Sequence, residues 1–286
     1  MIKNLEQVFA SSILFVILGA LVVTKASAQT RDTPKDKPAS ATFSMSVNPE
    51  FATGKYGGSS DIEDRYFGLG LRYETKAWTF KTTLPYLQTS SDRAFTRVDQ
   101  GQIHCRRSGT ECTQDPATTT TGVEKKTKSG LGDVGASATY HLPEMSSGLN
   151  LDLIGRGKFN TASASSGMGS GRNDLSLASG VSYDFKSWEP YSELGYKWRG
   201  KSDDPDLLNQ AFVVVGAKFF VGNASSLDLS YDFRAKSYAD EPAAKSVSLS
   251  LASRFDRNWK LEAYYIHGLS EVVADKVIGI STGYRF

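Results

Sequence analysis

The sequence of 286 residues has little of several features that would indicate common classes of protein. It contains two cysteines and three histidines, and its net charge is +2 at pH 7. A near-zero net charge does not suit a nucleic-acid-binding protein, which needs a concentrated basic surface. Beyond residue 28, no apolar run approaches the roughly 20 residues of a membrane-spanning helix. Mean hydropathy is −0.33. That value fits a soluble protein, but it also fits a barrel wall in which lumen-facing residues interrupt every apolar run.

The first 28 residues have the pattern of a secretory signal peptide. Lys3 is followed by an apolar run over residues 8–23, and Ala26-Ser27-Ala28 has the small-x-small pattern of a signal peptidase site. An N-terminal transmembrane anchor is the alternative, although the run is shorter than a spanning helix requires. Residues 29–40, rich in Pro, Lys and Asp, are predicted to form a flexible periplasmic leader.

From residue 41 onward, apolar and polar residues alternate with a period of two. In the last segment Ile278, Ile280 and Tyr284 fall on one face, and small or charged residues fall on the other. Such a strand suits a wall between lipid and water. The terminal Phe286 resembles the C-terminal signature of bacterial outer-membrane β-barrels, which would make the assembly machinery of that membrane a partner.

About twelve segments show the alternation, and most reach the 9–11 residues that a tilted membrane strand needs. They are residues 42–51, 66–74, 78–86, 133–141, 149–159, 175–185, 188–199, 210–221, 227–234, 246–255, 259–265 and 276–286. Residues 210–221 are almost all apolar, so the facing of this segment stays open. These segments predict an all-β fold, and their even number is typical of outer-membrane barrels. The predicted structure is a twelve-stranded antiparallel transmembrane up-and-down β-barrel of the outer-membrane type over residues 41–286.

The connections between these segments alternate in length. Short ones, such as 75–77 and 256–258, alternate with longer ones, such as 52–62 and 161–170. Outer-membrane barrels have short periplasmic turns and longer external loops, so we expect the long set on the outside.

Three of the short turns join an aromatic residue to a Trp. They lead from Tyr73 to Trp78, from Phe185 to Trp188 and from Phe255 to Trp259. Rings at these positions predict an aromatic girdle at the inner membrane–water interface.

The other face of the predicted strands carries charges of both signs. A soluble β-sandwich or a lipocalin-like barrel would show the same alternation with its apolar face turned inward. The aromatic terminus, the Trp turns and the many Gly and Ser residues of the polar face favour a membrane barrel. The predicted lumen-lining residues are then Arg72, Lys81, Asp133, Asp152, Arg156, Lys158, Glu193, Lys197, Asp228, Asp232, Arg234, Arg254 and Glu262. These charges either line an open, selective lumen or form a packed ionic plug.

The longest connection is a predicted external loop over residues 89–128. It carries several basic residues and both cysteines, Cys105 and Cys112. In an oxidising compartment we expect these two to form a loop-closing disulfide. The loop either folds inward as a constriction, contacts anionic lipopolysaccharide, or is a solvated loop without a role.

Several short motifs resemble those of the outer-membrane family named for the meta-pathway of phenol degradation. Leu84-Pro85-Tyr86 ends one predicted strand, and Ser129-Gly-Leu-Gly-Asp-Val134 opens the next. Gly169-Ser-Gly-Arg-Asn-Asp174 and Glu189-Pro-Tyr-Ser-Glu-Leu-Gly-Tyr196 also fit. The resemblance implies a passive channel for small, often aromatic, molecules, and it names no ligand.

Features that would indicate cofactor binding or catalysis are weak. Residues 130–135 match the dinucleotide fingerprint by letter, but a strand-like segment follows where that motif needs a helix. A lipid-active enzyme would need a base beside an activated hydroxyl. His104 lies in the loop, His141 faces the lumen beside no obvious nucleophile, and His267 lies on the apolar face with no Ser at matching height. We expect no enzymatic activity, cofactor or metal.

The sequence thus predicts a channel of the bacterial outer membrane for passive diffusion of small solutes, aromatic compounds among them. A structural or surface-interaction barrel with a plugged lumen is the main alternative, and a lipid-active enzyme is a third. Outer-membrane lipids and lipopolysaccharide are the expected surroundings.

Overall fold

The computed structural model describes residues 41–58, 60–91, 96–99, 102–104, 125–143, 148–162, 168–200 and 207–286. The strands are β1 (Thr42–Gly54), β2 (Ile62–Glu74), β3 (Trp78–Ser91), β4 (Thr96–Asp99), β5 (Gln102–His104), β6 (Lys126–Leu131), β7 (Val134–His141), β8 (Leu149–Phe159), β9 (Asp174–Tyr183), β10 (Trp188–Trp198), β11 (Gln210–Val221), β12 (Ser225–Arg234), β13 (Ala244–Arg254), β14 (Trp259–Gly268) and β15 (Lys276–Arg285). The predicted signal peptide and leader lie outside these residues. Within the described ranges, no helix is long and apolar enough to cross a membrane.

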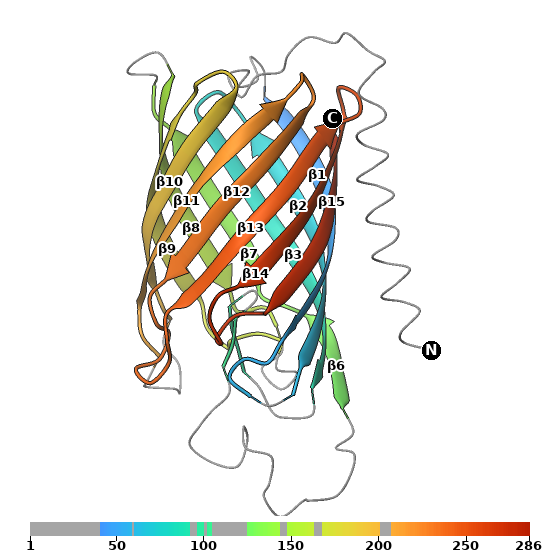
Figure 1. The fold of residues 1–286 in the computed structure, drawn as a ribbon, viewed down its shortest axis with the longest axis vertical. Coiled ribbons are helices and arrows are strands. Elements are labelled where there is room, and N and C mark those ends of the chain that lie inside the picture. The colour runs from blue at the N-terminus through green and yellow to red at the C-terminus, as the bar shows by residue number, and fades with distance from the viewer. Residues whose placement is uncertain are drawn as a thin grey trace, which may run out of the picture.

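One antiparallel sheet of 13 strands closes on itself. β1 pairs with β15 from Ser44↔Arg285 to Thr53↔Lys276, which joins the two ends of the sheet. β6 and β7 both pair with β3 and follow each other along it, so together they occupy one position in the wall. Counted in this way, the described strands form a closed twelve-stranded barrel with strongly tilted strands (Figure 1), which confirms the predicted fold.

Most of the large apolar side chains of the strands point away from the barrel axis. Leu153, Leu194 and Leu229 are 54%, 61% and 53% exposed, although all three lie within regular strands. In a soluble sandwich or a lipocalin-like barrel these residues would form the core. The soluble alternatives are therefore excluded, and the outer surface suits contact with acyl chains.

Aromatic rings form contacts at the end of the barrel that carries the short turns and the C terminus, and we call this set the aromatic girdle. Figure 1 shows the C terminus at the upper end of the barrel. Trp188 stacks on Phe185 with ring centroids 5.0 Å apart. Trp78 stacks on Phe80 at 5.7 Å. On the closing strand, Tyr284 contacts Trp259 edge-on at 4.9 Å. The three predicted Trp turns thus lie at one end of the barrel, where rings with an apolar body and a polar edge suit the interface.

The strands extend further than predicted at the opposite end. β3 continues to Ser91 and β6 begins at Lys126, so paired residues reach into the predicted loop 89–128. β4 and β5 form a two-stranded hairpin within that loop. Leu84-Pro85-Tyr86 lies inside β3 instead of ending it, because a bulge in the neighbouring strand accommodates Pro85.

Candidate functional site

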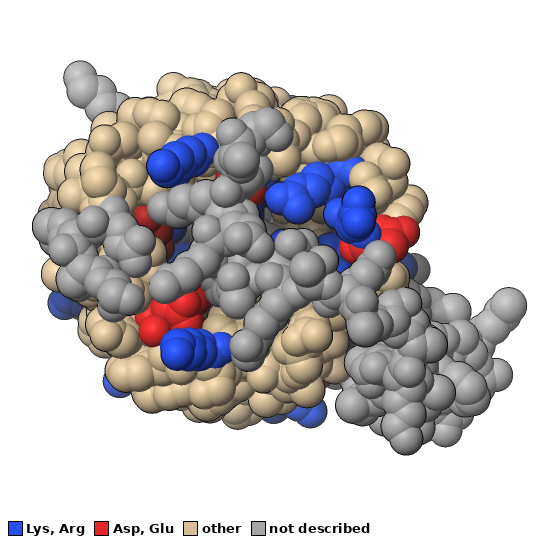
Figure 2. Space-filling model, turned by 90° about the horizontal axis from the view of Figure 1, so that it is seen from above, with Lys and Arg blue, Asp and Glu red and all other residues tan. Residues whose placement is uncertain are grey.

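The inward face of the barrel carries charged side chains of both signs. The structure places all of the predicted lumen residues on this face: Arg72, Lys81, Asp133, Asp152, Arg156, Lys158, Glu193, Lys197, Asp228, Asp232, Arg234, Arg254 and Glu262. Figure 2, from the end that carries the C terminus, shows basic and acidic side chains near the middle of a mostly uncharged ring. The candidate site is therefore the lumen itself.

Several of these charges are paired at the lumen wall. Arg156 donates two hydrogen bonds to Glu193, with distances of 2.7 and 2.6 Å. Arg72 binds Glu74 in the same way, at 3.1 and 2.8 Å. The side chains of Arg156 and Arg72 are nevertheless 39% and 41% exposed. These guanidinium groups therefore remain accessible to water and to a solute inside the barrel.

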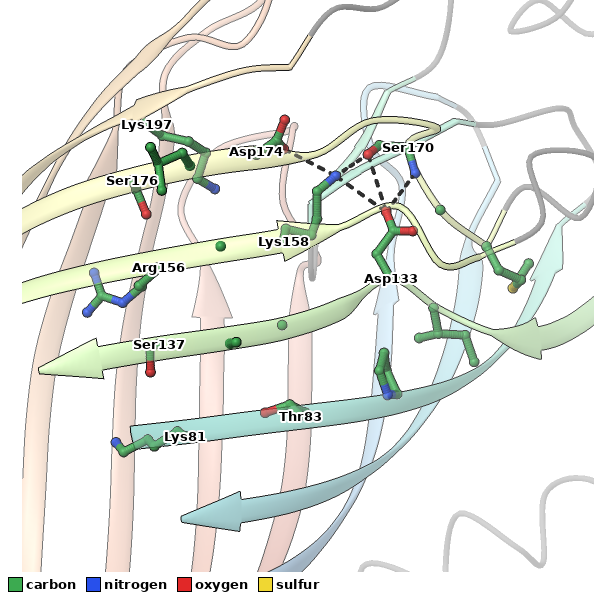
Figure 3. Close-up of a pocket in the computed structure, with 18 of the residues that line it drawn as sticks. Lys81, Thr83, Asp133, Ser137, Arg156, Lys158, Ser170, Asp174, Ser176 and Lys197 are labelled. Atoms are coloured by element: carbon green, nitrogen blue, oxygen red, sulfur yellow. Dashed lines mark hydrogen bonds and ion pairs between the residues drawn. The ribbon is translucent and has the colours of Figure 1, made fainter. Parts of the chain in front are cut away.

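Lys158 lies between two carboxylates near the end of the lumen opposite the C terminus (Figure 3). Its Nζ is 3.4 Å from Asp133 Oδ2 and 3.1 Å from Asp174 Oδ2, and it also contacts the hydroxyl of Ser170. Asp133 accepts hydrogen bonds from the backbone N–H groups of Ala162 and Ser170, at 3.2 and 3.1 Å. The cluster holds both described ends of the β8–β9 connection against the inside of the wall.

Asp174 extends this cluster into a buried ionic network. Arg199 Nη1 lies 3.2 Å and Arg172 Nε 3.4 Å from its carboxylate, and the three side chains are only 2–3% exposed. The backbone N–H of Gly200 donates to Asp174 at 3.0 Å, and Arg199 also donates to Gln210 at 3.3 Å. Buried charges are tolerated only when they are paired in this manner. Asp174 and Arg172 were not among the predicted lumen residues, although Arg199 lies on the predicted polar face of its segment.

A β-bulge explains the glycine-rich motif at residues 130–135. Thr83 pairs with Gly135 and Tyr86 with Leu131, so three residues of the bulged strand face two residues of β3. The N–H of Gly132 donates to the carbonyl of Pro85 at 2.9 Å. A Cβ at Gly132 would lie 2.7 Å from Leu87 Cδ1, so a larger residue would clash. The bulge turns Asp133 into the lumen, which is a structural role and not a nucleotide site.

A cavity of about 340 Å³ lies beside this cluster (Figure 3). Its charged lining consists of the basic residues Lys81, Arg156, Lys158 and Lys197 and the carboxylates Asp133 and Asp174, and its apolar lining includes Leu87 and Met168. This volume falls in the range of sites for small organic molecules.

Lumen-facing aromatic rings lie flat on glycines of the neighbouring strands. A Cβ at Gly279 would lie 2.2 Å from Tyr264 Cζ, and one at Gly195 would lie 2.3 Å from Phe212 Cζ. Tyr264 also donates to Glu50 at 2.7 Å, which fixes its ring along the wall. Glycine at these positions lets a large ring lie against the wall without projecting into the lumen.

Two small apolar clusters face the interior near the end of the barrel opposite the C terminus. The first consists of Ala52, Tyr56, Ile62, Ala274 and Val277, and the second of Leu87, Ala162 and Met168. Both are buried, and they narrow this end of the lumen with apolar side chains.

His141 has closer neighbours than the sequence indicated. Its Nε2 lies 2.9 Å from the hydroxyl of Thr79 and its Nδ1 lies 2.7 Å from Asp152 Oδ1. The expectation of no nucleophile beside His141 was therefore wrong, because β3 and β8 flank β7 and bring both groups to it. Thr79 is only 3% exposed, however, so its hydroxyl cannot reach a substrate. His267 Nδ1 lies 3.0 Å from the carbonyl of Asp275.

Other predicted features fall in part or wholly outside the described residues. Cys105 and Cys112 are not described, so the disulfide stays a prediction. His104 is described only in its backbone, where it pairs with Thr96. Among the described side chains, no group of three or more His, Cys, Asp or Glu residues is placed to hold a metal ion.

Sequence reasoning missed the apolar and aromatic members of the lumen, among them Phe212, Tyr191 and Tyr264. Their parity was a usable signal. Phe212 is an even number of residues from Lys218, and residues separated in this way along a strand lie on the same face. The same holds for Tyr191 and Glu189, and for Tyr264 and Glu262. A continuous alternation through each segment would have placed all three inward.

The closed antiparallel wall, its apolar exterior and its charged interior define an outer-membrane-type β-barrel. No protein-family model matches the sequence, and no curated protein matches it. An outer-membrane channel from Pseudomonas putida F1 has the same fold, with a TM-score of 0.64 at 14% identity over 89% of this chain and 99% of that chain. The KdgM porin in complex with disordered oligogalacturonate gives a TM-score of 0.50 at 8% identity, over 85% and 99% of the two chains. At these identities the likeness shows the fold, and the resemblance to the phenol-degradation family stays a prediction.

Proposed function

We propose that the protein is a passive channel of the bacterial outer membrane for small solutes. The observation that carries the proposal is the water-accessibility of enclosed charges. Arg72 and Arg156 remain 41% and 39% exposed inside a closed wall. In a packed ionic plug these groups would be buried, because a narrow barrel without a passage fills its interior with side chains.

The outer surface supports the membrane location. Leu194 is 61% exposed and Leu229 is 53% exposed, and rings such as Trp188 and Phe185 surround the end with the short turns. We infer that membrane lipids cover this surface, with lipopolysaccharide in the external leaflet. Phe286 would then be the group read by the barrel assembly machinery.

The size and the lining of the lumen favour small solutes that have an apolar part. The cavity measures about 340 Å³, and Leu87 and Met168 contribute apolar lining. We therefore extend the proposal to aromatic compounds and to membership of the family named for the meta-pathway of phenol degradation. The segment 129–134 supports this assignment, because its glycines build the bulge beside the cavity.

A plugged barrel is the second candidate, and one observation favours it. The buried network of Asp174, Arg172 and Arg199, together with Met168 at 1% exposure, narrows the external end of the lumen. In that case the barrel would be a structural or surface-interaction protein.

The test is single-channel recording from the refolded protein, without residues 1–28, in a planar lipid bilayer. A passive channel produces discrete conductance steps. A correctly folded barrel, with the expected β-sheet circular dichroism but no steps, would reject the channel and support the plugged barrel.

A further inference from the structure

One row of inward-facing residues crosses the wall of the barrel from strand to strand. The cross-strand register joins Arg72 to Lys81, Lys81 to Ser137, Ser137 to Arg156, Arg156 to Ser176, and Ser176 to Lys197. We call these six residues the basic row. Four of the six residues are basic, and the remaining two are serines. Figure 3 shows Lys81, Ser137, Arg156, Ser176 and Lys197 one after another across the wall.

The basic row leads from one mouth of the barrel to the other. Arg72 and Lys81 flank the short 75–77 turn, at the end that carries the C terminus. Lys197 lies at the other end of its strand, where β10 leads into the 199–209 connection. Since the strands are tilted, a row perpendicular to them climbs along the barrel axis. At about 4.8 Å per strand, successive cations beyond Lys81 are about 10 Å apart, with a hydroxyl between each pair.

Acidic side chains lie in a separate row. The register joins Asp152 to Gly180, Gly180 to Glu193, Glu193 to Val214, and Val214 to Asp232. On each shared strand this row lies four residues from the basic row, which is two inward-facing positions. The cations of the basic row thus follow one another across the wall, although Arg156 is bound to Glu193 of the acidic row and Arg72 is bound to Glu74.

Lys81 is the most available cation of the basic row. Its side chain is exposed, whereas Arg72 and Arg156 are each held in an ion pair with a glutamate. The charge of Glu74 attracts Lys81, whereas the charges of Arg72 and Arg156 repel it. An anion beside Lys81 would relieve this repulsion, which is the electrostatic condition for an anion site in a water-filled lumen.

Apolar groups lie beside the basic row. The ring of Phe212 lies 5.9 Å from the Arg156 guanidinium, and Leu87 and Met168 line the same cavity as Lys81 and Arg156. A solute with a carboxylate and an apolar body would satisfy both parts of the lining. We propose that the basic row is a path for small organic carboxylates, which makes the channel anion-selective. The proposal rests on the channel function proposed above and names its solute class.

The test combines reversal potentials in a KCl gradient with liposome swelling in benzoate, benzamide and benzylammonium. The wild-type channel should prefer chloride to potassium and pass benzoate faster than the other two probes. Lys81→Gln should lower the chloride-to-potassium permeability ratio by about threefold, because one lumen charge is lost. Lys81→Arg should retain the ratio.

Lys245→Gln is the matched control, because Lys245 is an exposed lysine that pairs with Phe233 on the outer face. It should leave the permeability ratio unchanged. A conducting channel without anion preference, or an equal effect of Lys81→Gln and Lys245→Gln, would overturn the anion path and leave the channel function standing. A folded barrel without conductance would instead overturn the channel function itself.

Discussion

Arg156 and Glu193 form a two-hydrogen-bond ion pair that bridges over an entire strand. Arg156 lies on β8 and Glu193 on β10, and β9 runs between them. The contact is possible because β9 presents the small residues Ala178 and Gly180 to the lumen at this level. A larger side chain there would separate the two charges.

This pair predicts how the selectivity of the lumen can be changed. Glu193→Gln removes the negative charge that compensates Arg156, so the preference for anions should rise by about two- to threefold in a water-filled lumen. The reversal potential in a KCl gradient measures the change. Glu63→Gln, which removes an exposed carboxylate paired with Lys125 outside the lumen, should have no effect. An equal shift in both variants would contradict a role for Glu193 in selectivity.

The buried network around Asp174 predicts a large loss of stability when this residue is substituted. Asp174→Ala leaves Arg199 and Arg172 buried without this carboxylate, and the free energy of unfolding should fall by about 3–5 kcal/mol. Asp232→Ala breaks the ion pair with Arg234, whose members are 25–32% exposed, and should cost at most about 1 kcal/mol. Urea unfolding in phospholipid vesicles measures both. Similar losses of unfolding free energy in the two variants would show that burial of the Asp174 network contributes nothing to stability.

The rings that lie flat on glycines predict a narrowing of the lumen. Gly279→Ala should push Tyr264 off the wall, since the new Cβ would lie 2.2 Å from its Cζ, and single-channel conductance should fall. Adding Tyr264→Ala should restore it. Gly135→Ala is the control, because Gly135 also faces the lumen but a Cβ there meets nothing within 4 Å. If Gly135→Ala lowered conductance as much, the ring would not be the cause.

The aromatic girdle predicts a position-specific stability effect. Trp188 stacks on Phe185 at 5.0 Å and on Phe219 at 6.2 Å. Trp188→Ala should therefore lower the free energy of unfolding in vesicles by about 1–3 kcal/mol. Trp188→Phe should retain much of this stabilisation, because the ring can still stack. An unchanged unfolding curve for Trp188→Ala would contradict the girdle.

The strand order and the facing of most residues could be predicted from the sequence because a strand has a strict period of two. Tyr284 and Arg285 needed only their positions in the alternation to be assigned to opposite faces. Segment 210–221 resisted this reasoning because apolar residues occur on both faces, and only pairing of Lys218 with Glu189 and Asp228 decides its register.

The lumen could be predicted less completely. Asp174, Arg172 and Met168 come together through the β8–β9 connection, and no period governs a connection. The neighbours of His141 also lay beyond reach, since Thr79 is 62 residues away and meets it only through the register of β3 and β7. Periodicity gives the face of a residue, whereas its partners depend on register and loop placement.

The facing of the two sides of the wall is the central claim, and thiol labelling tests it most directly. In a protein with both native cysteines replaced by serine, Ser230→Cys and Leu229→Cys place a thiol on adjacent residues of β12. A membrane-impermeant, water-soluble methanethiosulfonate reagent should label the thiol at position 230, which faces the lumen, and spare the one at 229, which is 53% exposed on the apolar outer side. Labelling at 229 with protection at 230, in protein reconstituted into vesicles, would contradict a lipid-facing exterior and a water-filled interior.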